Sequence, residues 1–123
     1  MVRDTELMTV FPGMVSSLLG QTSKLAAAGT GTTQAAGTSL TAGLTQFSTI
    51  TGASADSATL RSDWPELKPL AVFNTSGTTM NIFPHSGGKI NEGSTDAAVT
   101  LATAKCRVFW RLSSTQWFSM LGA

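Results

Sequence analysis

The stretch LAVFNTSGTTMNIFP, residues 70–84, decides the fold that this sequence predicts. It begins with a short apolar run, passes through a group of turn-forming residues that includes Asn74 and Gly77, and continues as a second run that ends at Pro84. Two apolar runs joined in this way predict a β-hairpin, in which Gly77 supplies the positive φ that a tight turn requires.

Further strand-like segments lie on both sides of this stretch, at spacings of roughly ten residues. The clearest of them, residues 105–112, alternates with period two, which is typical of a strand with one buried face. We expect its apolar residues to face the core and its basic residues to face outward beside Phe109. The inward set is Cys106, Val108, Trp110 and Leu112, and the outward set is Lys105, Arg107 and Arg111.

Seven short strands at this spacing predict an all-β chain, folded as a small antiparallel β-barrel or sandwich of about six to eight strands. The remaining expected strands are residues 44–51, 57–61, 97–102 and 115–121. We place this antiparallel β-domain in residues 36–123. The side chains expected in its core are Val72, Ile82, Val108, Trp110 and Trp117.

Charge is scarce and unevenly placed along the chain. Charged residues make up 12% of the sequence, against about 25% in an average protein, and between residues 7 and 55 only Lys24 is charged. An uncharged tract with apolar residues at intervals suits a segment that lies on another protein, and a flexible Gly/Ser/Thr linker is the alternative. We expect residues 1–35 to form an extended N-terminal arm, with one short helix near residues 12–19.

The residue inventory argues against several kinds of functional site. One cysteine excludes an internal disulfide and a Cys-based zinc site, and one histidine excludes a multi-histidine metal site within one chain. His85 and Ser86 are neighbours, which does not favour a base–nucleophile pair, and Cys106 is interpreted as a small buried residue. A formal net charge of +1 lacks the basic footprint of a nucleic-acid binder. We therefore expect no enzyme, no cofactor, no metal, no nucleic-acid partner and no membrane.

Residues 71–91 resemble a recurrent virion module of tailed bacteriophages, of the capsid decoration (cement) and head-fibre type. The match covers about residues 67–121, with a looser extension back to about residue 40. The resemblance implies a compact antiparallel β-barrel or β-tulip that assembles as a homotrimer. It implies structural roles only, in the hairpin, in the loop that follows it and in the core. The residues that carry it are Asn74, Gly77, Pro84, Ile90, Asn91 and Trp117.

The resemblance implies a capsid decoration protein that binds the outer surface of the phage head, stabilises the capsid lattice and is made in the host cytoplasm. Its partners would be its own copies and the major capsid protein, which the arm would contact. The arm residues expected at that contact are Leu7, Phe11, Val15, Leu18 and Leu19. The alternative is a head-fibre or tail-fibre tip that binds a host receptor or glycan, with Trp64 and Phe109 as the aromatic platforms; the lack of a long repetitive shaft favours the decoration protein.

Overall fold

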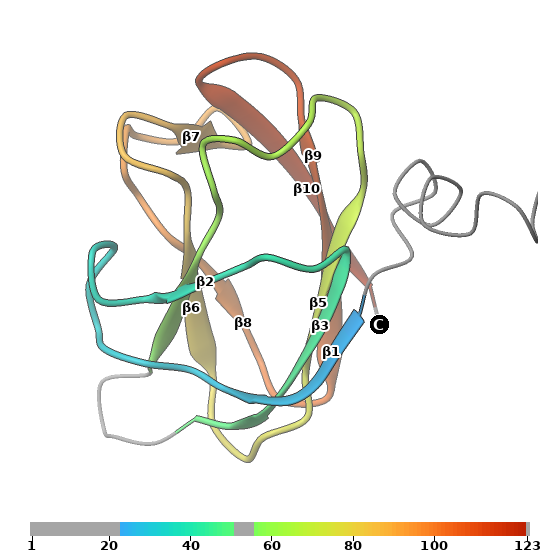
Figure 1. Ribbon diagram of the computed structural model, residues 1–123. Coiled ribbons are helices and arrows are strands. Elements are labelled where there is room, and N and C mark those ends of the chain that lie inside the picture. Colours follow the sequence, from blue (N-terminus) through green and yellow to red (C-terminus); the bar gives the residue numbers. More distant parts are fainter. Residues whose placement is uncertain (1–22, 51–55, 123) are drawn as a thin grey trace, which may run out of the picture.

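The computed structural model describes residues 23–50 and 56–122, which form ten β-strands and no helix (Figure 1). Accordingly, no helix in these two ranges is long and apolar enough to cross a membrane. The strands are β1 (Ser23–Ala28), β2 (Thr38–Ser39), β3 (Leu44–Thr49), β4 (Ser57–Thr59), β5 (Leu70–Asn74), β6 (Met80–Phe83), β7 (Lys89–Ile90), β8 (Val99–Leu101), β9 (Lys105–Arg111) and β10 (Gln116–Gly122).

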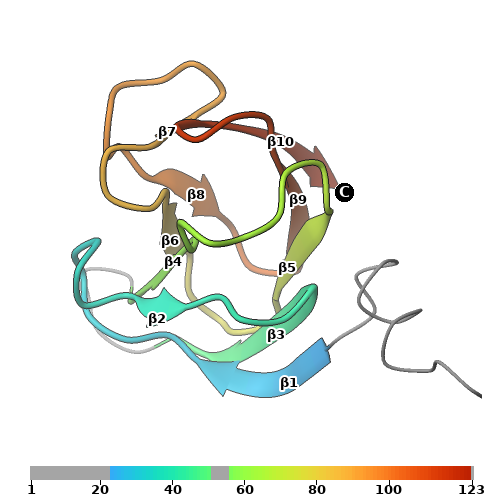
Figure 2. The same ribbon diagram turned by 45° about the horizontal axis from the view of Figure 1, so that its top comes forward.

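The strands form two sheets, and the chain passes from one to the other as it winds (Figure 2). Sheet A has the order β1-β3-β5-β9-β10-β7, and sheet B has the order β2-β4-β6-β8. From β1 to β6, successive strands alternate between sheets A and B, so each neighbour within a sheet belongs to the next turn of the chain. This arrangement is a β-solenoid of about four turns.

The direction of the strands changes at the last turn. The pairs β1–β3, β3–β5, β2–β4 and β4–β6 are all parallel. In contrast, β8 runs antiparallel to β6, β9 antiparallel to β5, and β10 antiparallel to β9. The antiparallel strands β8, β9 and β10 therefore pair with the last parallel strand of each sheet and cap that end of the solenoid.

The expected small antiparallel barrel or sandwich is wrong, although the described chain is all-β as expected. The expected hairpin is also wrong, because β5 and β6 lie in different sheets and residues 75–79 form a corner between them. Gly77 does not have a positive φ; among the described glycines, Gly31 and Gly87 do. Turn-forming residues bend a chain at such a corner as well as they reverse it in a hairpin. The local sequence therefore does not show which sheet the next strand joins.

The core lies between the two sheets and is filled mainly by aliphatic and aromatic side chains. Three of the expected core residues, Val72, Ile82 and Trp117, are fully buried there. Their buried neighbours are Ala27, Leu40, Phe47, Ile50, Ala58, Leu60, Trp64, Leu70, Met80, Ile90, Leu101 and Phe109. Because both sheets contribute to one continuous core, the described residues of the chain fold as one unit.

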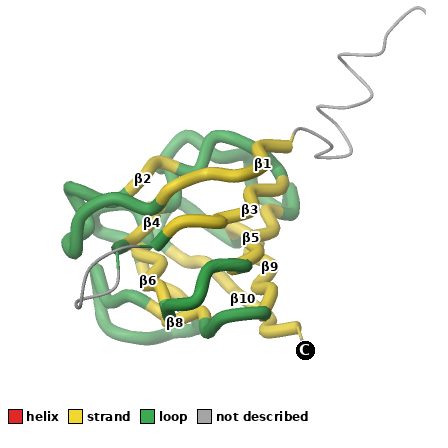
Figure 3. Tube along the Cα trace, turned by 90° about the horizontal axis from the view of Figure 1, so that it is seen from below, coloured by secondary structure: helices red, strands yellow, loops and turns green. Residues whose placement is uncertain are grey.

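The other end of the solenoid is formed by β1, which lies at the edge of sheet A (Figure 3). Its pairing with β3 is irregular, with register shifts between Lys24 and Ala27 and between Ala27 and Ala28. Ala26, between these residues, has a φ of 53°. Such irregularities disfavour the addition of a further strand to an exposed sheet edge. The same edge is where residues 1–22 join the described part of the chain.

Candidate functional site

The outer face of sheet A brings several apolar side chains of the described residues together at the surface. Cross-strand pairing places Leu44 beside Ala71, and Ala71 beside Val108. Val108 in turn pairs with Met120. The pairs Phe73–Cys106 and Trp110–Phe118 lie on the same side of the sheet, because paired residues share a face and residues two apart along a strand point the same way. We call these eight residues the apolar face: Leu44, Ala71, Phe73, Cys106, Val108, Trp110, Phe118 and Met120.

The apolar face is open to solvent and carries no charged side chain. Met120 is 59% exposed, Phe118 is 48% exposed and Phe73 is 36% exposed, while the other five residues are half-buried. Four strands, each about 4.8 Å wide, and three rows of side chains about 6.7 Å apart give a flat area of roughly 300–400 Å². Solvated faces of antiparallel sheets are normally polar, and contiguous apolar patches of this size are often functional. The apolar face is therefore the candidate functional site, and what it can do is bind another apolar protein surface.

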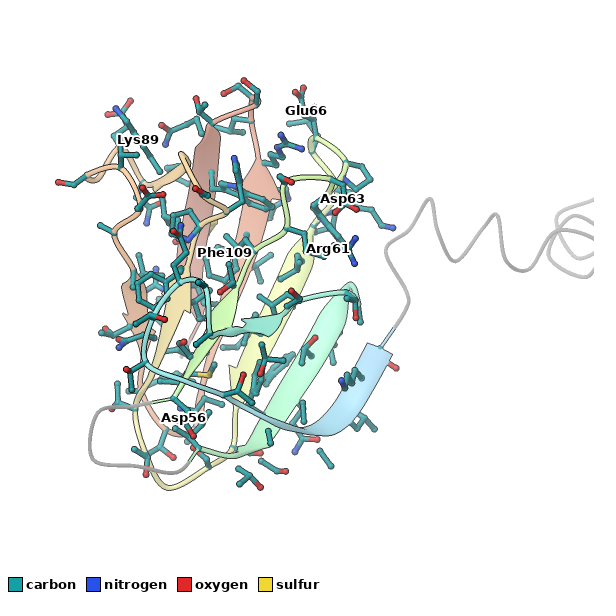
Figure 4. The ribbon with its side chains drawn as sticks, turned by 60° about the vertical axis from the view of Figure 1, so that its left-hand side comes forward. Asp56, Arg61, Asp63, Glu66, Lys89 and Phe109 are labelled. Atoms are coloured by element: carbon teal, nitrogen blue, oxygen red, sulfur yellow. The ribbon has the colours of Figure 1, made fainter. Side chains whose placement is uncertain are left out.

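Residues 105–112 face the opposite way from the prediction, and this places apolar side chains on the outer side of sheet A. Phe109 is fully buried and points into the core together with Leu70, its cross-strand partner (Figure 4). Val108 and Trp110, expected in the core, are half-buried on the outer side of sheet A instead. Both faces of β9 carry large side chains, so period-two alternation alone does not decide which one is buried.

The two arginines of β9 are accommodated on the inner side by backbone and hydroxyl oxygens. Arg111 donates hydrogen bonds to the carbonyls of Trp64 (2.9 Å), Ser113 (3.1 Å) and Ser114 (3.2 Å). Arg107 donates to the Ser119 hydroxyl at 2.9 Å, and its buried Nε has no hydrogen-bond partner among the described residues. Burial lowers the pKa of the Arg107 guanidinium. The expected basic outer stripe is therefore absent, which removes the one nucleic-acid feature that the sequence suggested.

His85 is almost fully buried and is held by Trp117. The indole Nε1 of Trp117 donates a hydrogen bond to His85 Nδ1 at 3.0 Å, so Nδ1 carries no proton in this arrangement. Burial and the nearby Arg111 guanidinium lower the pKa of His85. Since one ring nitrogen is already engaged with an indole, His85 acts in this structure as a hydrogen-bond acceptor that orients a core side chain.

A polar cleft with a volume of about 330 Å³ lies beside His85. Arg61 and Asp63 form an ion pair at its exposed rim (Figure 4), and the Arg61 hydrogen bond lowers the pKa of the Asp63 carboxyl. The full lining is Ser39, Thr59, Leu60, Arg61, Ser62, Asp63, His85 and Ser86. The two expected aromatic platforms do not line it, and both are buried: Trp64 is 6% exposed and Phe109 is fully buried. A sugar therefore has neither of the expected stacking surfaces here.

Asn74 holds the corner between the two sheets. It is fully buried, and its Nδ2 donates hydrogen bonds to the carbonyls of Thr78 (2.8 Å) and Leu101 (2.9 Å). Its Oδ1 accepts hydrogen bonds from the backbone N–H and the hydroxyl of Ser76, at 3.0 and 2.6 Å. Asn74 thus shapes a turn, as the resemblance implied, but the turn is a solenoid corner.

The other loop residues of the resemblance also have structural positions. Pro84 directly follows β6, and Ile90 is buried in β7, beside Trp117 of β10. Asn91 is bound to Ser119 twice: Nδ2 donates to the hydroxyl at 2.8 Å, and Oδ1 accepts from the backbone N–H at 2.6 Å. These contacts anchor the loop to sheet A.

Several expected features fall outside the described residues. The five expected contact residues of the arm and the expected short helix all lie within residues 1–22; of residues 23–35, Ser23–Ala28 forms β1. Within the described ranges, no group of three or more His, Cys, Asp or Glu side chains is placed to hold a metal ion. The apolar face itself was not expected from the sequence. The signal for it is the run of large apolar residues at both odd and even positions of residues 105–121.

Comparison with known proteins adds no family assignment, because no family model, no curated protein and no solved structure matches this chain.

Proposed function

We propose that this chain is an assembly protein whose action is attachment, and that it decorates the outer surface of a bacteriophage head. The observation that carries the proposal is the apolar face, an uncharged surface of a well-packed sheet that is open to solvent in the isolated chain. The resemblance of residues 71–91 to phage virion modules supports the choice of particle. The major capsid protein would be the partner, and clamping of its lattice would be the function.

The size of the apolar face explains why attachment would need more than this surface. Burying roughly 300–400 Å² of apolar area contributes about 8–10 kcal/mol, whereas association costs on the order of 4–15 kcal/mol. One face alone is therefore a weak attachment. The apolar residues of the N-terminal arm would add area, and assembly as a homotrimer would link three weak contacts into one strong one.

The test is co-sedimentation of the purified protein with phage heads that lack their decoration protein. We expect the unmodified protein to bind and the double variant Phe118→Lys/Met120→Lys to lose at least about tenfold in affinity, because a charge on the apolar face would be buried without a partner. The control is Leu67→Lys, since Leu67 is also strongly exposed (68%) but lies in the loop before β5. This control should bind like the unmodified protein.

Two results would contradict the proposal. The unmodified protein could fail to sediment with the heads, or the double variant could bind as tightly as the unmodified protein. Light scattering of the purified protein tests the homotrimer separately, because a monomer at all concentrations would remove the avidity on which the attachment depends.

A further inference from the structure

We propose that His85 is an acid-sensitive switch: when its imidazole ring takes up a proton, the ring leaves Trp117 and turns into the polar cleft beside it. The inference rests on the contacts of His85 and on the cleft, neither of which the proposed function uses. It is independent of whether the protein attaches to a phage head.

The contact between Trp117 and His85 requires a neutral imidazole. The indole Nε1–H of Trp117 donates its hydrogen bond to His85 Nδ1 at 3.0 Å, and an indole nitrogen is a donor only. A proton on Nδ1 would turn the acceptor into a second donor, so that two N–H groups would face each other. The contact that orients Trp117 is therefore lost when His85 becomes charged.

Of the two rings, only that of His85 lies beside open space. Trp117 is fully buried in the core, and its backbone pairs with Arg111 of β9 and Ile90 of β7. His85 is 8% exposed and lines the cleft of about 330 Å³. Rotation about the side-chain bonds of His85 would bring the charged ring from the indole into this cleft.

The backbone around His85 is held by hydrogen bonds that do not use the imidazole. Gln34 Nε2 donates to the carbonyl of Pro84 at 2.8 Å. The backbone N–H of Gly88 donates to the carbonyl of His85, also at 2.8 Å. These hydrogen bonds would persist when the ring turns, so the change would be confined to the side chain.

The position beside Trp117 is unfavourable for a charged imidazole. Burial lowers the pKa of His85 most, and the Arg111 guanidinium lowers it further. The Ser114 backbone and the Asp96 carboxylate raise the pKa of His85, but they do not offset these effects. Movement of the ring away from this position would therefore stabilise the charged form.

The cleft offers oxygen atoms to the two N–H donors of an imidazolium. Asp63 lies at its rim, and its hydrogen bond with Arg61 lowers the pKa of the Asp63 carboxyl, so Asp63 is ionised when His85 titrates. The Arg61 charge is balanced by this ion pair. The hydroxyl side chains that line the cleft are Ser39, Thr59, Ser62 and Ser86.

The test is an NMR titration of the full-length protein, labelled with nitrogen-15 at tryptophan, from about pH 8 to about pH 4. We expect the indole N–H signal of Trp117 to shift with a midpoint below about pH 6.5, the usual pKa of histidine. Trp64 is an internal control, because its Nε1–H donates to the carbonyl of Lys68 at 2.9 Å, and a carbonyl does not titrate. In His85→Gln the transition of Trp117 should vanish, since the amide oxygen accepts a hydrogen bond but does not take up a proton in this range.

A second pair of variants tests where the ring goes. Asp63→Asn removes the carboxylate at the cleft rim and should move the midpoint to lower pH by about 0.2–0.7 units, as expected for loss of one exposed ion pair. Glu66→Gln is the matched control, because it removes the same charge from an exposed residue that does not line the cleft. Its shift should be less than half as large.

Three results would overturn the proposal. The Trp117 signal could stay constant over the whole range in folded protein, which would show that the contact survives. The signals of Trp64 and Trp117 could change together, which would indicate unfolding of the whole domain. Equal shifts of the midpoint in Asp63→Asn and Glu66→Gln would show that the charged ring does not enter the cleft.

Discussion

Replacing Asn74 by Asp tests the corner that directs β5 and β6 into different sheets. The change removes both N–H donors of the side chain while keeping its size. The carbonyls of Thr78 and Leu101, which accept those hydrogen bonds at 2.8 and 2.9 Å, would then face carboxylate oxygens. Since Asn74 is fully buried, water cannot replace the lost donors at either carbonyl.

The expected loss of stability is large for a single substitution. A buried polar group left without its partner costs about 1–3 kcal/mol, and two carbonyls are affected, so we expect Asn74→Asp to lower the free energy of unfolding by about 3–5 kcal/mol at neutral pH. The total free energy of unfolding of a domain of this size is about 5–15 kcal/mol. The loss should shrink on acidification toward about pH 3, because a protonated carboxyl donates one hydrogen bond again.

The assay is urea unfolding of Asn74→Asp and the unmodified protein, compared at each pH so that other titrating groups cancel. Asn81→Asp is the matched control, because Asn81 is only half-buried on β6, and its cost should stay under about 1 kcal/mol. The reasoning would be refuted if Asn74→Asp unfolded within about 0.5 kcal/mol of the unmodified protein, or if its loss did not depend on pH.

Three further predictions concern single residues. Burial lowers the folded-state pKa of His85, so the free energy of unfolding should fall as the pH drops below about 6.5. Urea unfolding of His85→Gln should show a free energy of unfolding that depends less on pH, and the same pH dependence as in the unmodified protein would contradict this. Arg111→Met removes three hydrogen bonds to carbonyls and should cost about 2–4 kcal/mol in thermal unfolding, so an unchanged melting temperature would argue against this role. Gly31→Ala should cost about 1–3 kcal/mol, because Gly31 has a φ of 61° and the new Cβ would lie 2.3 Å from the Cβ of Ala36, whereas Gly77→Ala should be neutral within about 0.5 kcal/mol, since nothing lies within 4 Å of its Cβ position; equal losses in urea unfolding would count against this difference.

The positions of the strands were largely predictable from sequence, but their pairing was not. Residues 105–112 and 115–121 were expected as strands and form β9 (Lys105–Arg111) and β10 (Gln116–Gly122). Alternation and β-propensity are local properties of a strand, so they survive in any fold. Pairing depends on where each corner sends the chain, and residues 75–79 have a composition that fits both a hairpin and a solenoid corner.

The candidate site could not be predicted because the sequence does not show which face of β9 is buried. Val108 and Trp110 are as apolar as Phe109, and the flanking arginines suggested that the Phe109 side was solvated. In the structure Arg111 reaches backbone carbonyls on the inner side, as a long side chain with several donors is able to do. Tertiary hydrogen bonds of this kind leave no pattern in the sequence.

We propose that the apolar face of sheet A attaches the protein to a phage head. The most direct measurement is a cryo-electron microscopy map of undecorated heads incubated with the purified protein. We expect trimeric density on the outer surface, with the apolar face of each solenoid covered by capsid protein. Bare heads, or bound solenoids whose apolar face points to solvent, would contradict the claim.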